Sequence, residues 1–183
     1  PVITANKELL SKEGKYLFML AGERNVDLLF EAAVAGGIPL IRVLRESLLG
    51  EPVEKIMGIV NGTTNYILSQ MEENGMPYSE ALLEAQKLGY AESDPTADVS
   101  GQDAASKAAI IAMVAFGADV SLDDVLFEGI QNISSADVAF ASRAGCAIKL
   151  LAMISKHGHE LEVQVYPALL PNSHPLSLSL IHI

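Results

Sequence analysis

The chain has 183 residues and a formal net charge of −11, because 23 acidic side chains outnumber 12 basic ones. Such an acidic chain argues against nucleic acid or an anionic membrane surface as a partner. Half of the residues are hydrophobic, which predicts a globular domain with a sizeable core and argues against a disordered chain. The longest apolar run, residues 108–116, is too short to span a bilayer, and no signal peptide is visible. We therefore expect a soluble, cytoplasmic protein.

The chain opens with the strand, turn and helix order of α/β domains. Residues 1–3 are a short β-branched run, and a helix is predicted from Lys7 to about Gly22, with an interruption at Gly14. Ligands bind at the carboxyl ends of such strands, where Lys7 would stand. An exposed lysine in the first turn of a helix is the more common interpretation, although it opposes the helix dipole unless an anion lies nearby.

Glu31 lies within the apolar segment 28–34, which is compatible with either a strand or a buried helix. Buried carboxylates are paired or bind a metal. The following loop, residues 34–38, has free backbone carbonyls, and a carboxylate with carbonyl oxygens suits a hard cation. An ion pair between Glu31 and Arg42 or Arg45 explains the same residue at least as well.

Turn residues divide the next part of the chain into three helices and one strand. We expect a helix over 39–49, a strand over 53–60, a helix over 65–73 and a helix over 79–89. The strand ends in a polar turn, and Thr63 or Thr64 is expected to cap the helix that follows. Gly89 ends the last of these helices.

Residues 85–107 are rich in acidic side chains, namely Glu92, Asp94, Asp98 and Asp103. The apolar run 108–116 follows directly, and a helix that is apolar on nearly all sides is a buried helix. Asp103 and Lys107 are four residues apart and therefore share one side of the first turns of that helix. We expect carboxylates and one ammonium group to converge beside an apolar wall, where the pKa of a lysine can be tuned for proton transfer. A solvated helix pair is the ordinary alternative for this spacing.

The C-terminal third is predicted to begin with a loop that leads into a short helix over 118–125. A further helix would start at a cap, Ser134 or Ser135, and run to about Lys156. Cys146 would be a small core residue of that helix, and a single cysteine offers no disulfide framework. His157-Gly158-His159 is a polar turn without a third metal ligand in sight. Residues 160–166 alternate as in a half-buried strand, and 167–175 are extended or loop.

A pattern of fixed residues gives the chain a specific resemblance to a known family. The pattern is Ala85-x3-Gly89-Tyr90-Ala91-x2-Asp94-Pro95-x2-Asp98-Val99-x-Gly101-x-Asp103-x3-Lys107. Together with Thr4-Ala-Asn-Lys7, the Glu31 to Gly37 loop and Gly58-Ile-Val-Asn-Gly-Thr-Thr-Asn65, it resembles homoserine dehydrogenase over nearly the whole chain. Members of that family interconvert aspartate 4-semialdehyde and homoserine with NAD or NADP, on the route to threonine, methionine and isoleucine.

The resemblance implies catalytic and substrate-binding roles for four residues of the acidic stretch. Lys107 would exchange a proton with the substrate oxygen as hydride moves to or from the nicotinamide. Asp103 would bind substrate and keep the lysine in register with it. Glu92 and Asp98 would bind the amino group of the substrate, which explains an acidic pocket for a cationic amine.

The resemblance also implies sites for a cofactor and a metal. Lys7 would lie between cofactor and substrate and take part in catalysis, and Gly89 would let the backbone approach both closely. A sodium ion would be held by Glu31 and by the carbonyls of Val34, Gly36 and Ile38. A small-molecule substrate and a full-length homodimer complete the implied set of partners.

The chain departs from a complete dehydrogenase because it has no early Gly-x-Gly-x-x-Gly for the dinucleotide phosphates. We therefore expect a fragment that is inactive alone, with residues 1–25 as a Rossmann-like remnant of the dinucleotide-binding domain. Residues 26–176 would be the catalytic and substrate domain, and 177–183 an atypical tail. The expected fold class is α+β, with helices covering one face of a mixed sheet. A non-catalytic substrate-binding or oligomerisation module is the alternative function.

Overall fold

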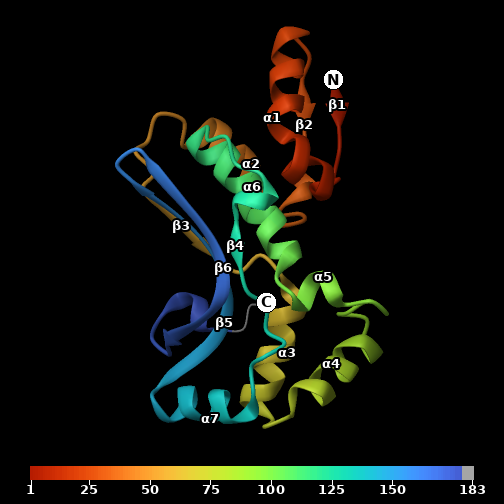
Figure 1. The fold of residues 1–183 in the computed structure, drawn as a ribbon, viewed down its shortest axis with the longest axis vertical. Helices are drawn as coiled ribbons and strands as arrows, with labels where there is room; N and C mark the ends of the chain where they lie inside the picture. The colour runs from red at the N-terminus through yellow and green to blue at the C-terminus, as the bar shows by residue number, and fades with distance from the viewer. Residues whose placement is uncertain (179–183) are drawn as a thin grey trace.

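The computed structural model describes residues 1–178, and Figure 1 shows the ribbon as two connected parts. In the smaller part, β1 (Val2–Ile3) and β2 (Leu28–Leu29) form a parallel two-stranded sheet, and α1 (Lys7–Glu23) crosses between them. The larger part is built on a four-stranded sheet. No helix among the described residues is long and apolar enough to cross a membrane.

Short helical elements connect the small sheet to the large one, namely η1 (Glu31–Ala33), α2 (Leu40–Arg42) and the π-helical η2 (Val43–Ser47). The remaining elements, in chain order, are β3 (Lys55–Gly58), α3 (Gly62–Glu73), α4 (Tyr78–Lys87), α5 (Thr96–Val99), α6 (Gln102–Phe116), η3 (Leu122–Asp124), β4 (Leu126–Phe127), α7 (Ser135–Arg143), β5 (Cys146–His157), β6 (Glu160–Pro171) and η4 (Pro175–Ser177). The elements expected between residues 39 and 116 are present with shifted ends, whereas the short α5 and β4 had not been predicted.

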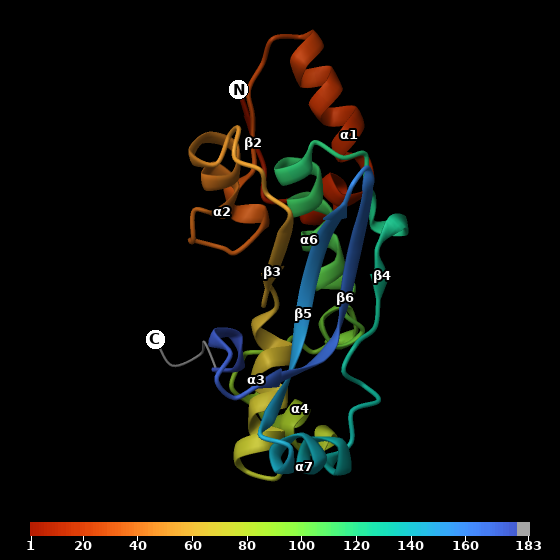
Figure 2. The same ribbon diagram turned by 90° about the vertical axis from the view of Figure 1, so that its left-hand side faces the viewer.

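The large sheet is mixed and has the strand order β3-β5-β6-β4. β5 pairs antiparallel with both β3 and β6, while β4 runs parallel to β6. In Figure 2 the sheet lies in front of α6 and α3, and these helices pack on the face turned away from the viewer. The expected α+β fold, with helices covering one face of a mixed sheet, is confirmed.

The two prolines of β6 lie where the strand has one partner. β4 pairs with β6 only at Gln164 and Val165. Beyond Val165, Pro167 lies opposite Leu150 and Pro171 lies opposite Cys146, both on β5. Proline has no N–H to donate, so the nitrogens of both prolines must face away from β5 if the pairing is to continue past them.

The helix α6 is the centre of the core, as its apolar sequence predicts. Most of its residues are buried, and it packs against α1 on one side and against β5 and β6 on the other. Gly14 does not interrupt α1, which contradicts the predicted break. A Cβ at Gly14 would lie 2.9 Å from the side chain of Met113, so the glycine allows α1 to approach α6 closely.

Residues 146–156 were predicted as helix and are instead the strand β5. The helix α7 begins as expected, with Ser134 as its N-cap and Asp137 completing a capping box. It ends before Gly145, whose φ of +69° suits the left-handed residue that follows a helix. Eight of the twelve residues of β5 are buried, and the run 147–152 is buried without a break. Such a strand shows no alternation, which is why its pattern resembled a buried helix.

Lys149 of β5 is a buried lysine, with 1% of its surface exposed. Its Nζ donates to Ser69 Oγ at 3.2 Å and lies 3.7 Å from Glu72 Oε2, both on α3. Burial lowers the pKa of Lys149 below 10.5, and the nearby charge of Glu72 only partly compensates. The lysine therefore joins the sheet to α3, but its buried charge is only partly compensated.

Gly129 lies so close to the backbone of Val99 and Ser100 that a side chain at this position would clash with it. A Cβ at this residue would lie 2.0 Å from the carbonyl oxygen of Val99 and 2.6 Å from Ser100 Cα. The next residue, Ile130, donates its N–H to Val99 O at 2.9 Å. The segment around Gly129 therefore packs directly against the backbone at the end of α5, just before the start of α6.

We predict that Gly129→Ala lowers the free energy of unfolding by about 3 kcal/mol, the upper part of the usual range for overpacking, because backbone atoms cannot move aside. Gly14→Ala is the matched control, since its new Cβ meets only the flexible end of Met113. That variant should stay within about 1 kcal/mol of the wild type, as alanine also favours the helix by a similar amount. Urea unfolding of both variants measures the difference, and equal losses would contradict the proposed backbone contact.

Candidate active site

Asp103 lies at the centre of a cluster formed by four helices. One carboxylate oxygen, Oδ1, is 2.9 Å from Lys7 Nζ at the start of α1. The other, Oδ2, accepts from Lys107 Nζ at 2.6 Å and from Asn61 Nδ2 at 2.8 Å. Asn61 also donates to Asp98 Oδ1 of α5 at 2.7 Å. Asp103 is 7% exposed, so both lysines meet a nearly buried anion.

Local structure explains why Asp103 and Lys107 stand together. Gly101 precedes α6 with a φ of +85°, a conformation that glycine adopts without strain. Asp103 then falls in the first turn, where the helix dipole favours a negative charge. Lys107 follows one turn later on the same side and also donates to the carbonyl of Val60 at 2.7 Å. The i,i+4 pair predicted from the sequence is present, and it is partly buried rather than solvated.

The charges of the cluster stabilise one another. Burial alone would raise the pKa of Asp103, but the hydrogen bond and charge of Lys107, followed by the hydrogen bonds from Lys7 and Asn61, hold that pKa below 3.8. The hydrogen bond to Asp103 likewise raises the pKa of Lys7 above 10.5 against the opposing effect of burial. Asp103 is therefore ionised and Lys7 protonated at neutral pH.

Asn61 was missed as a site residue. The sequence around it predicts a polar turn, with Thr63 or Thr64 as the cap of the next helix. Instead Asn61 is the N-cap of α3, and its Oδ1 accepts from the backbone N–H of Thr64 at 2.9 Å. An asparagine before a helix was the signal available, because Asn is a favoured N-cap residue. The local sequence gave no sign that Asp98 and Asp103 would lie beside Asn61 in the folded chain.

The first part of the acidic stretch packs against the start of α3. Gly89 ends α4 with a φ of +79°, and the Gly89 and Tyr90 N–H groups bond back to Gln86 and Ala85. The Tyr90 carbonyl accepts from Thr63 Oγ1 at 2.6 Å. The ring of Tyr90 packs on the ring of Tyr66 of α3, with centroids 4.5 Å apart. These contacts hold the stretch against the start of α3.

The predicted substrate residues differ in how far the fold restrains them. Asp98 is half-buried and held by Asn61. The side chain of Glu92 is exposed, while its backbone carbonyl accepts from Gln86 Nε2 at 3.1 Å. Gly89 is exposed too, with open space where a Cβ would be. Lys7, Asp98, Asp103 and Lys107 are therefore linked in one network through Asn61. Glu92 and Gly89 lie on the segment that joins α4 to α5.

Glu31 is bound to the backbone of the following helix. Its Oε1 accepts from the N–H of Ile41 and its Oε2 from the N–H of Arg42, both at 2.8 Å. Arg42 thus contacts Glu31 through its backbone, while its guanidinium pairs with Glu46. Each carboxylate oxygen retains a lone pair for a cation.

The loop after Glu31 has an unusual backbone. Ala35 has a φ of +61° and Gly36 a φ of +58°, and the left-handed conformation is rare for alanine. The Ile38 carbonyl accepts from Leu40 N–H at 2.8 Å. Glu31 and the carbonyls of Val34, Gly36 and Ile38 offer oxygen atoms alone, and this donor set fits a hard cation. Within residues 1–178, no three His, Cys, Asp or Glu side chains converge as a metal site.

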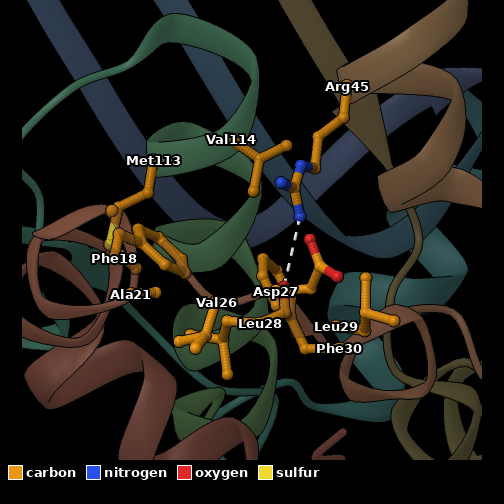
Figure 3. Close-up of a pocket in the computed structure, with 11 residues that line it drawn as sticks. Phe18, Ala21, Val26, Asp27, Leu28, Leu29, Phe30, Arg45, Met113 and Val114 are labelled. Carbon is orange, nitrogen blue, oxygen red and sulfur yellow. Dashed lines mark hydrogen bonds between the residues drawn. The ribbon is translucent and has the colours of Figure 1, made fainter. Parts of the chain in front are cut away.

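A cavity of about 380 Å³ lies apart from the lysine cluster, between α1, β2 and the end of α6. Figure 3 shows Arg45 reaching across it toward the backbone of Leu28, whose carbonyl accepts from Arg45 Nη1 at 3.3 Å. Phe18 and Phe30 stack beneath, with centroids 5.3 Å apart. None of the predicted catalytic or substrate residues lines this cavity. The chemistry of the cluster therefore lies outside it.

Two lysines around a nearly buried carboxylate mark this cluster of the α+β domain as a candidate functional site. Residues 39–179 match the homoserine dehydrogenase family. The chain belongs to that family.

Sequence relatives and solved structures agree with this assignment. A homoserine dehydrogenase of Corynebacterium glutamicum is 53% identical over 181 residues, which cover 96% of this chain and 41% of the relative. The crystal structure of a homoserine dehydrogenase from Thiobacillus denitrificans superposes with a TM-score of 0.93 at 43% identity, over 96% of this chain and 41% of that one. A hyperthermophilic archaeal homoserine dehydrogenase in complex with NADPH gives a TM-score of 0.81 at 34% identity, over 97% and 50%. The chain spans about two fifths of the length of the curated relatives it matches.

We predict that Asp103→Asn lowers the free energy of unfolding by about 3 kcal/mol at pH 7, because it leaves two ammonium groups without their buried partner. The folded-state pKa of Asp103 lies below its ordinary value of 3.8. Its stabilising effect is therefore complete above that value and is lost as the pH falls through the folded-state pKa. Urea unfolding of wild type and variant between pH 7 and 3 should show the difference narrowing at acidic pH.

Asp119→Asn is the control for this prediction, since Asp119 pairs with Lys15 at an exposed surface site. An exposed pair contributes about 0–1 kcal/mol, so this variant should unfold nearly as the wild type does. A pH-independent difference for Asp103→Asn would contradict the ionised cluster.

Proposed function

We propose that the protein carrying this chain is an NAD(P)-dependent homoserine dehydrogenase that interconverts aspartate 4-semialdehyde and homoserine. The observation that carries the proposal is the Lys7–Asp103–Lys107 cluster at the base of the acidic stretch. The nicotinamide, when bound, supplies or accepts the hydride. The chain's own residues then have to bind an amino acid and move one proton at its oxygen.

Lys107 is the proposed proton donor and acceptor. Two of the three N–H directions of its ammonium group are used by Val60 O and Asp103 Oδ2, and 18% of its side chain is exposed. The third direction is left for the substrate oxygen. In the reducing direction Lys107 gives a proton to the carbonyl oxygen of the semialdehyde, and in the oxidising direction it removes the hydroxyl proton of homoserine.

Asp98 and Glu92 are proposed to bind the ammonium group of the substrate, with Asp103 completing the negative field. Asn61 occupies Asp98 Oδ1, which leaves Oδ2 for the substrate. Glu92 is exposed on the same segment and can close on a bound amine. An acidic site of this kind attracts a cationic amino group electrostatically.

The cofactor is proposed to lie beside Lys7 and Gly89. Lys7 is 40% exposed even though it pairs with Asp103, so its ammonium can contact cofactor and substrate as well. Gly89 presents a bare stretch of backbone that a ligand can approach closely. The archaeal relative solved with NADPH supports a nicotinamide cofactor, NADP or NAD, for this protein.

A sodium ion is proposed at Glu31 and the carbonyls of Val34, Gly36 and Ile38. The support is the oxygen-only donor set and the left-handed Ala35, because a strained loop residue is retained when it serves a bound group. The same proposal treats 1–25 as a remnant of the dinucleotide-binding domain and 26–176 as the substrate domain. It also includes a homodimer, which sedimentation of the complete protein would test, and a place in threonine, methionine and isoleucine biosynthesis.

We predict that Lys107→Ala in the complete enzyme lowers kcat for homoserine oxidation by roughly 10²–10⁴-fold, the usual scale for a general acid or base. The KM for homoserine should change far less. Asp98→Asn should show the opposite split, with a raised KM and a smaller change in kcat. Steady-state kinetics with NADP and NAD provide the measurement. Lys15→Ala, a surface lysine paired with Asp119, is the control. A Lys107→Ala enzyme with near-normal kcat would remove this lysine from the mechanism.

We predict that sodium stabilises the protein through Glu31. Unfolding in sodium chloride and in choline chloride of equal ionic strength should differ by about 1.4 kcal/mol when sodium is at ten times its Kd. Glu31→Gln should abolish this difference. Glu46→Gln is the matched control, because Glu46 is an exposed carboxylate on the neighbouring helix. A difference that persists in Glu31→Gln would place the ion elsewhere.

A further inference from the structure

We propose that Asn61 is a positioning residue, which holds Asp98 and Asp103 in one fixed arrangement so that Asp98 Oδ2 and the ammonium of Lys107 face a common substrate. The inference rests on the proposed function for the identity of that substrate. The arrangement itself is a property of the folded chain and can be tested separately.

The side chain of Asn61 uses all of its hydrogen-bonding capacity. Its two Nδ2 protons go to Asp98 Oδ1 at 2.7 Å and to Asp103 Oδ2 at 2.8 Å. Its Oδ1 accepts from Thr64 N at 2.9 Å and from Thr64 Oγ1 at 3.0 Å. Only 4% of the residue is exposed. A side chain bonded on every side cannot rotate without losing several partners, so it fixes the groups it touches.

Helix capping alone does not explain an asparagine here. A cap needs one acceptor oxygen, which Ser, Thr or Asp would supply equally well. Ser134 does this for α7 with its hydroxyl, at an exposed site. At position 61 the amide nitrogen, Nδ2, also donates to two carboxylates. Serine would leave both without these donors, and aspartate would add a third negative charge.

The bridge answers an electrostatic difficulty of the site. Two carboxylates that lie close together repel each other, and hydrogen-bond donors between them offset that repulsion. Lys7 of α1, Lys107 of α6 and Asn61 of α3 contact Asp103, and Asp98 of α5 is joined to it through Asn61. Asn61 stands between the two anions. The backbone carbonyl of the preceding residue, Val60, accepts from Lys107 and so fixes the lysine from the same turn.

The bridge also selects which oxygen atoms are available. Asp103 Oδ2 accepts from both Lys107 and Asn61, and Oδ1 pairs with the ammonium of Lys7. Asp98 has one oxygen occupied and one left for an ammonium group. Loss of the bridge would free Asp98 to rotate, so the cost should fall on substrate binding. It should also weaken the ionised form of Asp103, whose pKa Asn61 helps to lower.

Asn61→Ser tests the inference, since it keeps a capping oxygen and removes both amide donors. In the complete enzyme we expect at least a tenfold rise in KM for homoserine, with a smaller change in kcat. The acidic limb of the kcat/KM profile against pH should move to higher pH. Ser134→Ala is the control, because it removes the capping hydroxyl of another helix, α7, and leaves every bond of Asn61 in place. It should lower Tm without moving KM or the acidic limb.

A carbon-13 carboxyl titration of Asp103 gives a reading that needs no activity. The pKa of Asp103 should be higher in Asn61→Ser than in the wild type and unchanged in Ser134→Ala. An unchanged pKa with an unchanged KM would overturn the inference, whereas a wild-type enzyme that cannot oxidise homoserine would overturn the proposed function alone. If Asn61→Ser fails to fold, Asn61→Asp keeps a strong cap and should shift the titration in the same direction.

Discussion

The carboxylate of Asp103 is the point on which the rest of the site depends. It receives one lysine from α1, another from α6 and the amide of Asn61 from the start of α3, and through Asn61 it is joined to α5. Four helices, of which only α5 and α6 are neighbours in the sequence, therefore meet at one nearly buried charge. The balance of two cations against two anions allows that charge to persist away from water, where a single ion would be strongly disfavoured.

The core supplies the rigidity that such a cluster requires. α6 carries Asp103 and Lys107 in its first two turns, and its later turns are buried against α1 and the sheet. The segment at Gly129 supports the same helix start from behind through backbone contact. The proton transfer proposed for Lys107 requires the lysine to keep its position while its charge changes, and a well-anchored helix provides this.

Local spacing was sufficient to predict part of the structure. The Asp103–Lys107 pair, the buried α6 and the helix stop at Gly89 each follow from residues within a few positions of one another. The partners that tertiary folding brings in, Lys7 and Asn61, could not be placed in the cluster from spacing alone. The helix predicted over β5 was wrong for a related reason. A central strand buried on both faces has no alternation of apolar and polar residues that separates it from a buried helix. The hydrogen bonds that Glu31 accepts from the backbone N–H groups of Ile41 and Arg42 depend on the path of the loop between them, which side-chain types do not encode.

The prolines of β6 have a consequence for how the molecule meets its neighbours. In the part of the chain that the structure describes, β6 beyond Val165 has no strand on its outer side. Such an exposed edge normally invites another chain to add a strand, which leads to aggregation. Pro167 and Pro171 remove two of the outward N–H donors that an incoming strand would need. Among residues 1–178 the two prolines therefore make this edge a poor template for another strand, and replacing them would restore the donors that strand addition needs.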